Sequence, residues 1–260
     1  MNTAADDLDD GLAYDVEFSD SPLSDSETVD NKVPERTDAV TGSSSKKRKK
    51  NQGGLKDKKR TKMEQDIDRK RNLAKQDVET ISEYLNDKIR RKYSDLSALE
   101  LAEKYFSKSD VRSTQDFDDE RNLTNLESFI TSRFKNMLSP KQDDEVKYIA
   151  ILSSSAIRAC DTHRATKDLK NGSVKLITKN KLSADISVMS KTRSRVLCST
   201  PARILKVLES DELSVSKDNV KIVIIDNSYL DKKQQNIWDL AEAIDAVKEL
   251  TSAGAKLYFY

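Results

Sequence analysis

The spacing of apolar residues along the chain changes near residue 145. Between Met63 and Lys92, apolar residues recur at intervals of three, four, six or seven, the spacing that places them on one face of a helix. From Glu145 onward, short apolar runs alternate with stretches of helical periodicity, which is typical of a parallel sheet whose strands are joined by helices. The pattern therefore predicts a helical prefix followed by an α/β domain with a parallel sheet of about five strands.

Three helices are predicted in the prefix, over residues 63–92, 97–106 and 123–138, and a polar stretch over residues 107–119 separates the last two. The first helix contains no Gly or Pro and carries a single narrow apolar stripe. A stripe this narrow is typical of a docking surface rather than of a cofactor site. We therefore expect the prefix to lie across the domain that follows it.

The α/β domain is predicted over residues 145–260. Its strands are predicted at 146–152, 174–178, 195–198, 220–225 and 256–260, and its helices at 156–170, 184–190, 201–210 and 237–253. The fourth strand reads Val-Lys-Ile-Val-Ile-Ile, which is almost continuously apolar. Such a run indicates a strand that is covered by helices on both faces of the sheet.

Charge is distributed in blocks along the chain. The sequence has 46 Lys or Arg and 45 Asp or Glu among 260 residues, and a formal net charge of +1. Residues 1–45 carry 12 acidic and 2 basic side chains, residues 46–75 carry 14 basic and 4 acidic ones, and the remainder is balanced. Blocks of like charge are typical of disordered interaction segments. Residues 1–62 are therefore predicted to be a disordered tail, acidic and then basic.

Serines in the acidic segment have acidic neighbours, a setting that acidophilic kinases prefer. The candidates for phosphorylation are Ser19, Ser21, Ser24 and Ser26. Added phosphates would deepen the negative charge of the segment and strengthen its docking to a basic partner. The alternative interpretation is a solvating tail that has no dedicated partner.

A two-part basic tract follows the acidic segment. Its central residues are Lys46, Lys47, Arg48, Lys49, Lys50, Lys58, Lys59 and Arg60. Consecutive bases that are not interleaved with acids indicate a nuclear localisation signal, a nucleic-acid contact, or both. We predict import into the nucleus or nucleolus by an import receptor. Charge alone leaves a chromatin or DNA-replication-linked nuclear role open as an alternative.

Several classes of protein and site are disfavoured. No apolar run approaches the roughly 20 residues that span a bilayer, and the first ten residues lack the pattern of a signal peptide, so we expect a soluble intracellular protein without a membrane partner. Two cysteines and one histidine have no metal-ligand spacing, which predicts no metal site. Cys160 and His163 could form a nucleophile and base, but a small core residue and an exposed imidazole on one helix are favoured.

Polar residues follow two of the predicted strands, where ligands collect in parallel α/β sheets. Ser153, Ser154 and Ser155 follow the first strand, and Arg158 lies one turn into the next helix. The third strand is followed in the same way by Thr200, Pro201 and Arg203. Hydroxyls, free amide groups and an arginine at a helix start predict a phosphate-binding site. The alternative for each strand end is ordinary helix capping.

The sequence lacks the loops that bind nucleotides. Asp226 follows the fourth strand, and an acid there can hold a magnesium-bound water. However, neither G-x-x-x-x-G-K-[ST] nor G-x-G-x-x-G occurs, and the only glycines after Gly54 are Gly172 and Gly254. We therefore predict no cofactor, no small-molecule substrate and no catalytic residue.

Three segments together resemble a known domain. Ile151 to Arg158, Val196 to Leu205 and Val223 to Tyr229 match, in order and approximate spacing, the P-T-R-E-L-A, T-P-G-R and D-E-A-D motifs of DEAD-box RNA helicases. The T-P-x-R match is good, whereas the third segment keeps only Asp226 and has Asn227 in place of the catalytic glutamate. The resemblance implies a degenerate form of that family's first RecA-like domain, without ATPase chemistry. It also implies that the first two segments hold an RNA backbone.

The acidic segment, the basic tract, the helical prefix and this domain together resemble the Cms family of nucleolar proteins of the small-subunit processome, the early 90S pre-ribosome. The resemblance implies a non-catalytic factor in ribosome assembly and pre-rRNA processing. It implies pre-ribosomal proteins and pre-ribosomal RNA as partners, with residues 1–62, 63–140 and 145–260 as tail, prefix and degenerate RecA-like domain. An RNA-dependent ATPase that a partner's loop completes is the enzymatic alternative, which the missing glutamate disfavours.

Overall fold

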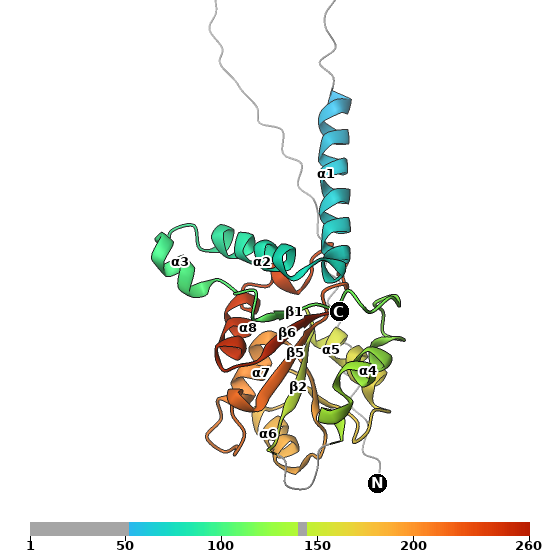
Figure 1. The fold of residues 1–260 in the computed structure, drawn as a ribbon, viewed down its shortest axis with the longest axis vertical. Coiled ribbons are helices and arrows are strands. Elements are labelled where there is room, and N and C mark those ends of the chain that lie inside the picture. Colours follow the sequence, from blue (N-terminus) through green and yellow to red (C-terminus); the bar gives the residue numbers. More distant parts are fainter. Residues whose placement is uncertain (1–51, 140–144) are drawn as a thin grey trace, which may run out of the picture. The chain divides into compact units, whose positions relative to one another are not determined.

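The computed structural model describes residues 52–139 and 145–260. All of them belong to one compact unit, Asn51–Tyr260. The predicted acidic segment, its candidate phosphorylation sites and the first half of the basic tract lie outside the described residues. The prediction of an α/β fold with a parallel sheet is confirmed (Figure 1).

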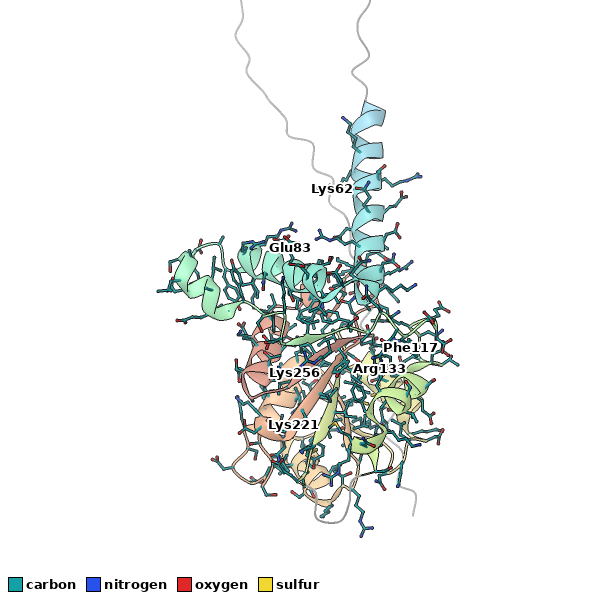
Figure 2. All side chains as sticks on the ribbon, viewed as in Figure 1. Lys62, Glu83, Phe117, Arg133, Lys221 and Lys256 are labelled. Atoms are coloured by element: carbon teal, nitrogen blue, oxygen red, sulfur yellow. The ribbon has the colours of Figure 1, made fainter. Side chains whose placement is uncertain are left out.

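The predicted first helix is two helices in the structure, and the first of them begins at Gln52, within the segment predicted to be a disordered tail. α1 spans Gln52–Asn72, a 3-10 turn covers Leu73–Lys75, and α2 spans Val78–Lys92. The Asp77 side chain accepts a hydrogen bond from the Thr80 backbone N–H at 2.8 Å, which starts a new helix there. Charged side chains such as Lys62 on α1 and Glu83 on α2 are exposed (Figure 2).

The rest of the prefix contains two helices and an unexpected strand. α3 spans Ala98–Lys104 and begins with a capping box between Ser97 and Glu100, and α4 spans Leu126–Leu138. The polar stretch between them contains β1, Val111–Arg112, which joins the edge of the sheet. The prediction of about five strands missed this one. The domain boundary predicted between residues 140 and 145 stays a prediction.

The sheet has six parallel strands in the order β1-β6-β5-β2-β4-β3. The five predicted strands correspond to β2 (Tyr148–Leu152), β3 (Val174–Leu176), β4 (Val196–Ser199), β5 (Val220–Ile225) and β6 (Lys256–Phe259). The connecting helices are α5 (Ala156–Thr166), α6 (Leu182–Lys191), α7 (Pro201–Leu208) and α8 (Ala243–Ser252). Short 3-10 turns lie at Lys217–Asn219 and Ile237–Asp239, so the predicted helix over 237–253 is interrupted before α8.

Helices cover both faces of the sheet, and each face has its own core. α2, α7 and α8 cover one face of the sheet, and α4 and α5 cover the other (Figure 1). Ala150 and Leu152 of β2 belong to the core on the first face, and Ile149 and Ile151 belong to the core on the second. Alternate residues of one strand therefore serve opposite cores. The predicted burial of the 220–225 strand is confirmed, because five of its six residues are buried.

Candidate functional site

The carboxyl end of the sheet has a crevice between β2 and β5. These two strands are neighbours, and Leu152 pairs with Ile225 at their ends. The chain passes from β2 into α5 on one face, and from β5 toward α8 on the opposite face. Ligands of open α/β sheets bind at such a point, where adjacent connections diverge. The segments after both strands, Ser153–Ser155 and Asp226–Tyr229, are the ones that the sequence pointed to.

An ion pair bridges this crevice. Arg158 donates from Nε to Asp226 Oδ2 at 2.7 Å and from Nη2 to Oδ1 at 3.0 Å. Both side chains are largely buried, and the Tyr229 ring lies 4.3 Å from the guanidinium carbon. Burial disfavours the charge on Arg158, but the bonds and charge of Asp226 outweigh it and raise the pKa of Arg158. The carboxylate of Asp226 is therefore engaged by the protein itself.

The three serines after β2 differ in their surroundings. The Ser155 hydroxyl accepts a hydrogen bond from the Arg158 backbone N–H at 3.2 Å, which caps α5. Ser153 is completely buried, and the hydroxyls of Ser153 and Ser154 have no hydrogen-bond partner within the described residues. Capping thus accounts for Ser155, whereas the hydroxyls of Ser153 and Ser154 are buried and unpaired within the described residues.

The second predicted strand end lies beside the first, because β4 pairs with β2. Arg203 donates from Nε to Asp185 Oδ2 at 2.8 Å and from Nη2 to the Asn180 carbonyl at 2.9 Å. Asp185 is only 1% exposed. Pro201 occupies the first turn of α7, and the Thr200 side chain makes no capping bond. Each predicted phosphate-binding arginine therefore has an internal carboxylate, and the RNA role of Arg158 and Arg203 stays a prediction.

Asn227 holds three segments together at this edge. Its Nδ2 donates to the Lys70 carbonyl at 2.7 Å, and its Oδ1 accepts from Trp238 Nε1 at 3.1 Å. The side chain is completely buried. The residue that replaces the catalytic glutamate of the resembled helicases is thus fully used in joining the end of α1 and the turn before α8 to β5.

An arginine-lined cleft opens beside the Arg158–Asp226 pair. Its volume is about 460 Å³, and its lining includes Arg71, Arg121 and Arg158 together with Thr124, Ser228 and Tyr229. Arg71 is exposed and makes no ion pair within the described part of the chain. Three guanidinium groups and the single carboxylate of Asp226 leave the cleft with excess positive charge, which suits an anionic group.

Arg121 is the most buried of the three, at 8% exposure. Its Nη2 donates to the Thr114 carbonyl at 2.6 Å, while Nε and Nη1 have no partner within the described residues. Burial lowers the pKa of Arg121. Sequence reasoning missed Arg71 and Arg121 because both belong to the prefix, and no motif or spacing connects them with the strand ends.

The other candidate chemistry is dispersed. His163 Nδ1 lies 2.9 Å from the Ser173 hydroxyl, and the structure gives no hydrogen bond between His163 and Cys160. Burial raises the pKa of the Cys198 thiol to about 11. In the described ranges, no three His, Cys, Asp or Glu side chains are grouped as metal ligands, and no helix is long and apolar enough to cross a membrane.

The described part of the basic tract lies on α1. Lys58, Lys59 and Arg60 are exposed there, and Arg60 pairs with Glu64 at 3.1 Å. Lys46 to Lys50 lie outside the described residues. The import role of the tract stays a prediction.

Comparison with known proteins identifies a family. A family model described as "CMS1: U3-containing 90S pre-ribosomal complex subunit" matches residues 26–257. Protein CMS1 of Chaetomium thermophilum is 31% identical over 188 residues, which cover 69% of this chain and 74% of the relative. Protein CMS1 of Saccharomyces cerevisiae is 34% identical over 189 residues, which cover 68% of this chain and 61% of the relative. Protein cms1 of Schizosaccharomyces pombe is 30% identical over 178 residues, which cover 66% of this chain and 62% of the relative.

No solved structure matches the chain. These relatives confirm the resemblance to the Cms family that the charged segments, the prefix and the following domain indicated. The matching region spans most of this chain, from the acidic segment to β6. The chain belongs to the CMS1 family of U3-containing 90S pre-ribosomal complex subunits.

Proposed function

We propose that this chain is a non-catalytic nucleolar factor of early small-subunit ribosome assembly and pre-rRNA processing, whose helicase-like domain docks RNA and protein. Its family is described as a subunit of the U3-containing 90S pre-ribosomal complex, which supports pre-ribosomal proteins and pre-ribosomal RNA as its partners. The basic tract, part of which is exposed on α1, supports delivery to the nucleus by an import receptor.

The Arg158–Asp226 pair carries this proposal. A nucleotide hydrolase needs an acid to hold a magnesium-bound water and a base or positioning group beside it. Here Asp226 is bonded twice to Arg158, and Asn227 is an amide whose groups are taken by Lys70 and Trp238. No phosphate-binding loop occurs in the sequence. What this edge offers is binding capacity, through the arginines of the cleft and the lining residues Thr124 and Ser228.

The first test is titration calorimetry of the full chain with magnesium ATP. We expect no heat of binding for the parent chain or for Asn227→Glu, because restoring a carboxylate does not supply groups that hold the phosphates. Thermal melting would verify that each protein is folded. Micromolar affinity for ATP would contradict the proposal and support the partner-completed ATPase.

A second test addresses the docking cleft, with Arg71→Ala as the variant. Arg71 is exposed and has no carboxylate partner in the described ranges, so its removal should leave the melting temperature unchanged. We expect weaker binding of single-stranded RNA at low salt and a salt slope smaller by about 0.7, the value for one phosphate contact. The control is Arg91→Ala, an exposed arginine on α2 outside the cleft.

Crosslinking in cells, followed by identification of the bound nucleic acid, distinguishes the nuclear alternatives. Recovery of precursor ribosomal RNA is the expected result. Recovery of genomic DNA would instead support a chromatin or replication-linked role, because the basic tract binds either polyanion through phosphate charge.

A further inference from the structure

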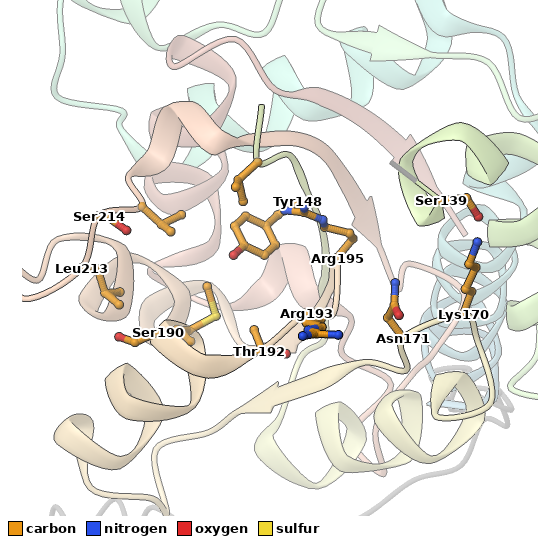
Figure 3. A pocket seen from close by; sticks show the side chains of 13 residues that line it. Ser139, Tyr148, Lys170, Asn171, Ser190, Thr192, Arg193, Arg195, Leu213 and Ser214 are labelled. Atoms are coloured by element: carbon orange, nitrogen blue, oxygen red, sulfur yellow. The ribbon is translucent and has the colours of Figure 1, made fainter. Parts of the chain in front are cut away.

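The amino end of the sheet contains a second recess, which we call the amino-edge groove. Its volume is about 660 Å³, and it lies between the start of β2, the segment leading into β4, the end of α6 and the turn after α5. The residues that define its chemistry are Tyr148, Lys170, Ser190, Thr192, Arg193 and Arg195 (Figure 3). Because all the strands are parallel, this groove and the arginine-lined cleft lie at opposite ends of the sheet.

The described residues that line the groove include three cations and no carboxylate. Lys170, Arg193 and Arg195 form no ion pair within the described residues, whereas Arg158 and Arg203 each have a buried aspartate. Figure 3 shows Arg193 and Arg195 in the middle of the groove and Lys170 toward one end. Unpaired cations in a recess concentrate positive potential and attract a polyanion.

The backbone fixes one of these arginines at the strand edge. The Arg195 carbonyl accepts a hydrogen bond from the Ile149 N–H at 2.8 Å, and its guanidinium lies 5.9 Å from the centre of the Tyr148 ring. Arg193 precedes Arg195 by two residues, and its side chain is exposed. The hydroxyls of Thr192 and Tyr148 add donors between the cations. The Ser190 hydroxyl donates instead to the Ile186 carbonyl at 3.0 Å. Guanidinium forks and hydroxyl donors are the groups that contact nucleic-acid phosphates.

We propose that the amino-edge groove binds the phosphate backbone of RNA at a site separate from the arginine-lined cleft. The inference shares with the proposed function the premise that this protein handles RNA, but it uses none of the residues of that cleft. The absence of carboxylates among the described lining residues favours a polyanion over a protein surface of mixed charge. With a phosphate-binding surface at each end of the sheet, the domain would hold two RNA segments apart at a fixed distance.

The test measures binding of a uridine oligonucleotide, which forms no helix of its own, to the full chain over a range of salt concentrations. The variant combines Arg193→Ala with Arg195→Ala. The control combines Arg91→Ala with Arg112→Ala, which removes the same charge from two exposed arginines that have no ion pair in the described ranges. The basic tract contributes equally in all three proteins, so differences between them belong to the substituted residues.

We expect the salt slope of the groove variant to fall by about 1.4, since each single-strand phosphate contact contributes about 0.7. That change corresponds to about 25-fold weaker binding at 0.1 M salt, and the affinities should converge as salt approaches 1 M. The control should bind like the parent. All three should melt at the same temperature, because the substituted side chains make no ion pair and Arg195 keeps its backbone bond.

A slope and affinity equal to those of the control would overturn the inference. So would a groove variant that keeps its RNA affinity but loses affinity for a polyglutamate peptide, because the groove would then be a protein site. The Arg71→Ala variant separates this outcome from failure of the proposed function. If only Arg71→Ala loses RNA affinity, RNA binds at the arginine-lined cleft and the groove inference is refuted. If only the groove variant loses RNA affinity, RNA binds at the amino-edge groove and the proposed role of the cleft is refuted.

Discussion

Arg203 shows how a residue expected to face a ligand can be held inside the fold. Arg203 is 6% exposed, and its guanidinium donates hydrogen bonds to Asp185 and to the Asn180 carbonyl. These bonds fasten α7 to α6 and to the loop before α6. Asn180 in turn donates to the other oxygen of Asp185 at 2.8 Å. Removing one member of such a buried pair costs far more than the pair contributes, because the remaining charge stays buried without a partner.

We therefore predict that Arg203→Ala lowers the free energy of unfolding by about 3–5 kcal/mol. Urea denaturation measures the loss, and Arg193→Ala, which removes an exposed arginine without an ion pair, should change stability by less than about 0.5 kcal/mol. If Arg203 also contacts an RNA phosphate, as the sequence predicts, Arg203→Ala should reduce the salt slope of RNA binding by about 0.7. An unchanged slope in the folded variant would limit Arg203 to its structural role.

His163 gives the folded protein a distinct response to acid. Burial, with the charges of Lys175 and Arg164, lowers the pKa of the imidazole below its ordinary 6.5. The unfolded chain therefore takes up this proton first as the pH falls, and the free energy of unfolding decreases from about pH 6.5 downward. We predict that His163→Gln flattens this part of the pH profile, which urea denaturation between about pH 7.5 and about pH 5 would measure.

Two aspartates titrate in a separate range. Burial tends to raise the pKa of Asp239 and Asp245, but bonds to Lys88 and Lys70 for the first, and to Lys92 and Tyr93 for the second, outweigh it and lower both values below 3.8. Their contribution is present above the unfolded pKa and is lost only as the pH falls below about 4. Above pH 5 these aspartates therefore do not contribute to the change in stability. If His163→Gln and the parent have the same stability profile above pH 5, the acid response in that range does not come from His163.

At the scale of elements, the helices and strands whose positions follow from apolar periodicity could be predicted from the sequence. The core strands and the helices between them follow from apolar runs and helical spacing, and every one of the five predicted strands is present. β1 was missed because two residues in a polar stretch have no periodicity of their own. Val111 becomes a strand residue only because Leu257 of β6 offers backbone groups to pair with.

The break between α1 and α2 was missed for a different reason. Residues 63–92 keep a helical spacing throughout, so the apolar pattern shows no end. The helix stops because Leu73 and Ala74 are drawn into the core and Asp77 caps a new helix. Likewise Arg71 and Arg121 reach the cleft through tertiary packing, which no strand-end motif encodes.

Asn227 offers a test of how elements are joined at this edge. Asn227→Asp keeps the shape but loses the donor to the Lys70 carbonyl and places a charge at a completely buried position. We predict a loss of at least about 2 kcal/mol in the free energy of unfolding at neutral pH. Asn136→Asp, on the exposed side of α4, is the matched control and should be nearly neutral. Equal stability of the two variants would contradict the joining role.

For the whole molecule, the basic tract is expected to determine nuclear import without contributing to the stability of the fold. Lys58, Lys59 and Arg60 are exposed, so alanine at these three positions removes no core contact. The variant carries alanine there and at Lys46 to Lys50. We predict that the substituted protein spreads into the cytoplasm while its melting temperature stays within about 2 °C of the parent. Imaging of a fluorescent fusion and thermal melting of the purified protein measure the two properties. Unchanged nucleolar accumulation would show that partners carry the protein in.

The pairing of β1 with β6 has a consequence for how the chain is made. The single proton of the Thr114 hydroxyl is shared between the carbonyl of Ala74 in the prefix, at 2.8 Å, and the carbonyl of Phe259 at the end of β6, at 3.0 Å. Phe259 lies 145 positions after Thr114 in the sequence. Ribosomes add about 5–20 residues per second, so a newly made β1 waits about 7–30 s for its partner strand. The prefix helices wait as well, because Lys88 and Lys92 bond to Asp239 and Asp245, which are also translated late. The prefix of this ribosome-assembly protein is thus translated first, but its contacts with β6, Asp239 and Asp245 form only after the rest of the sheet has been made.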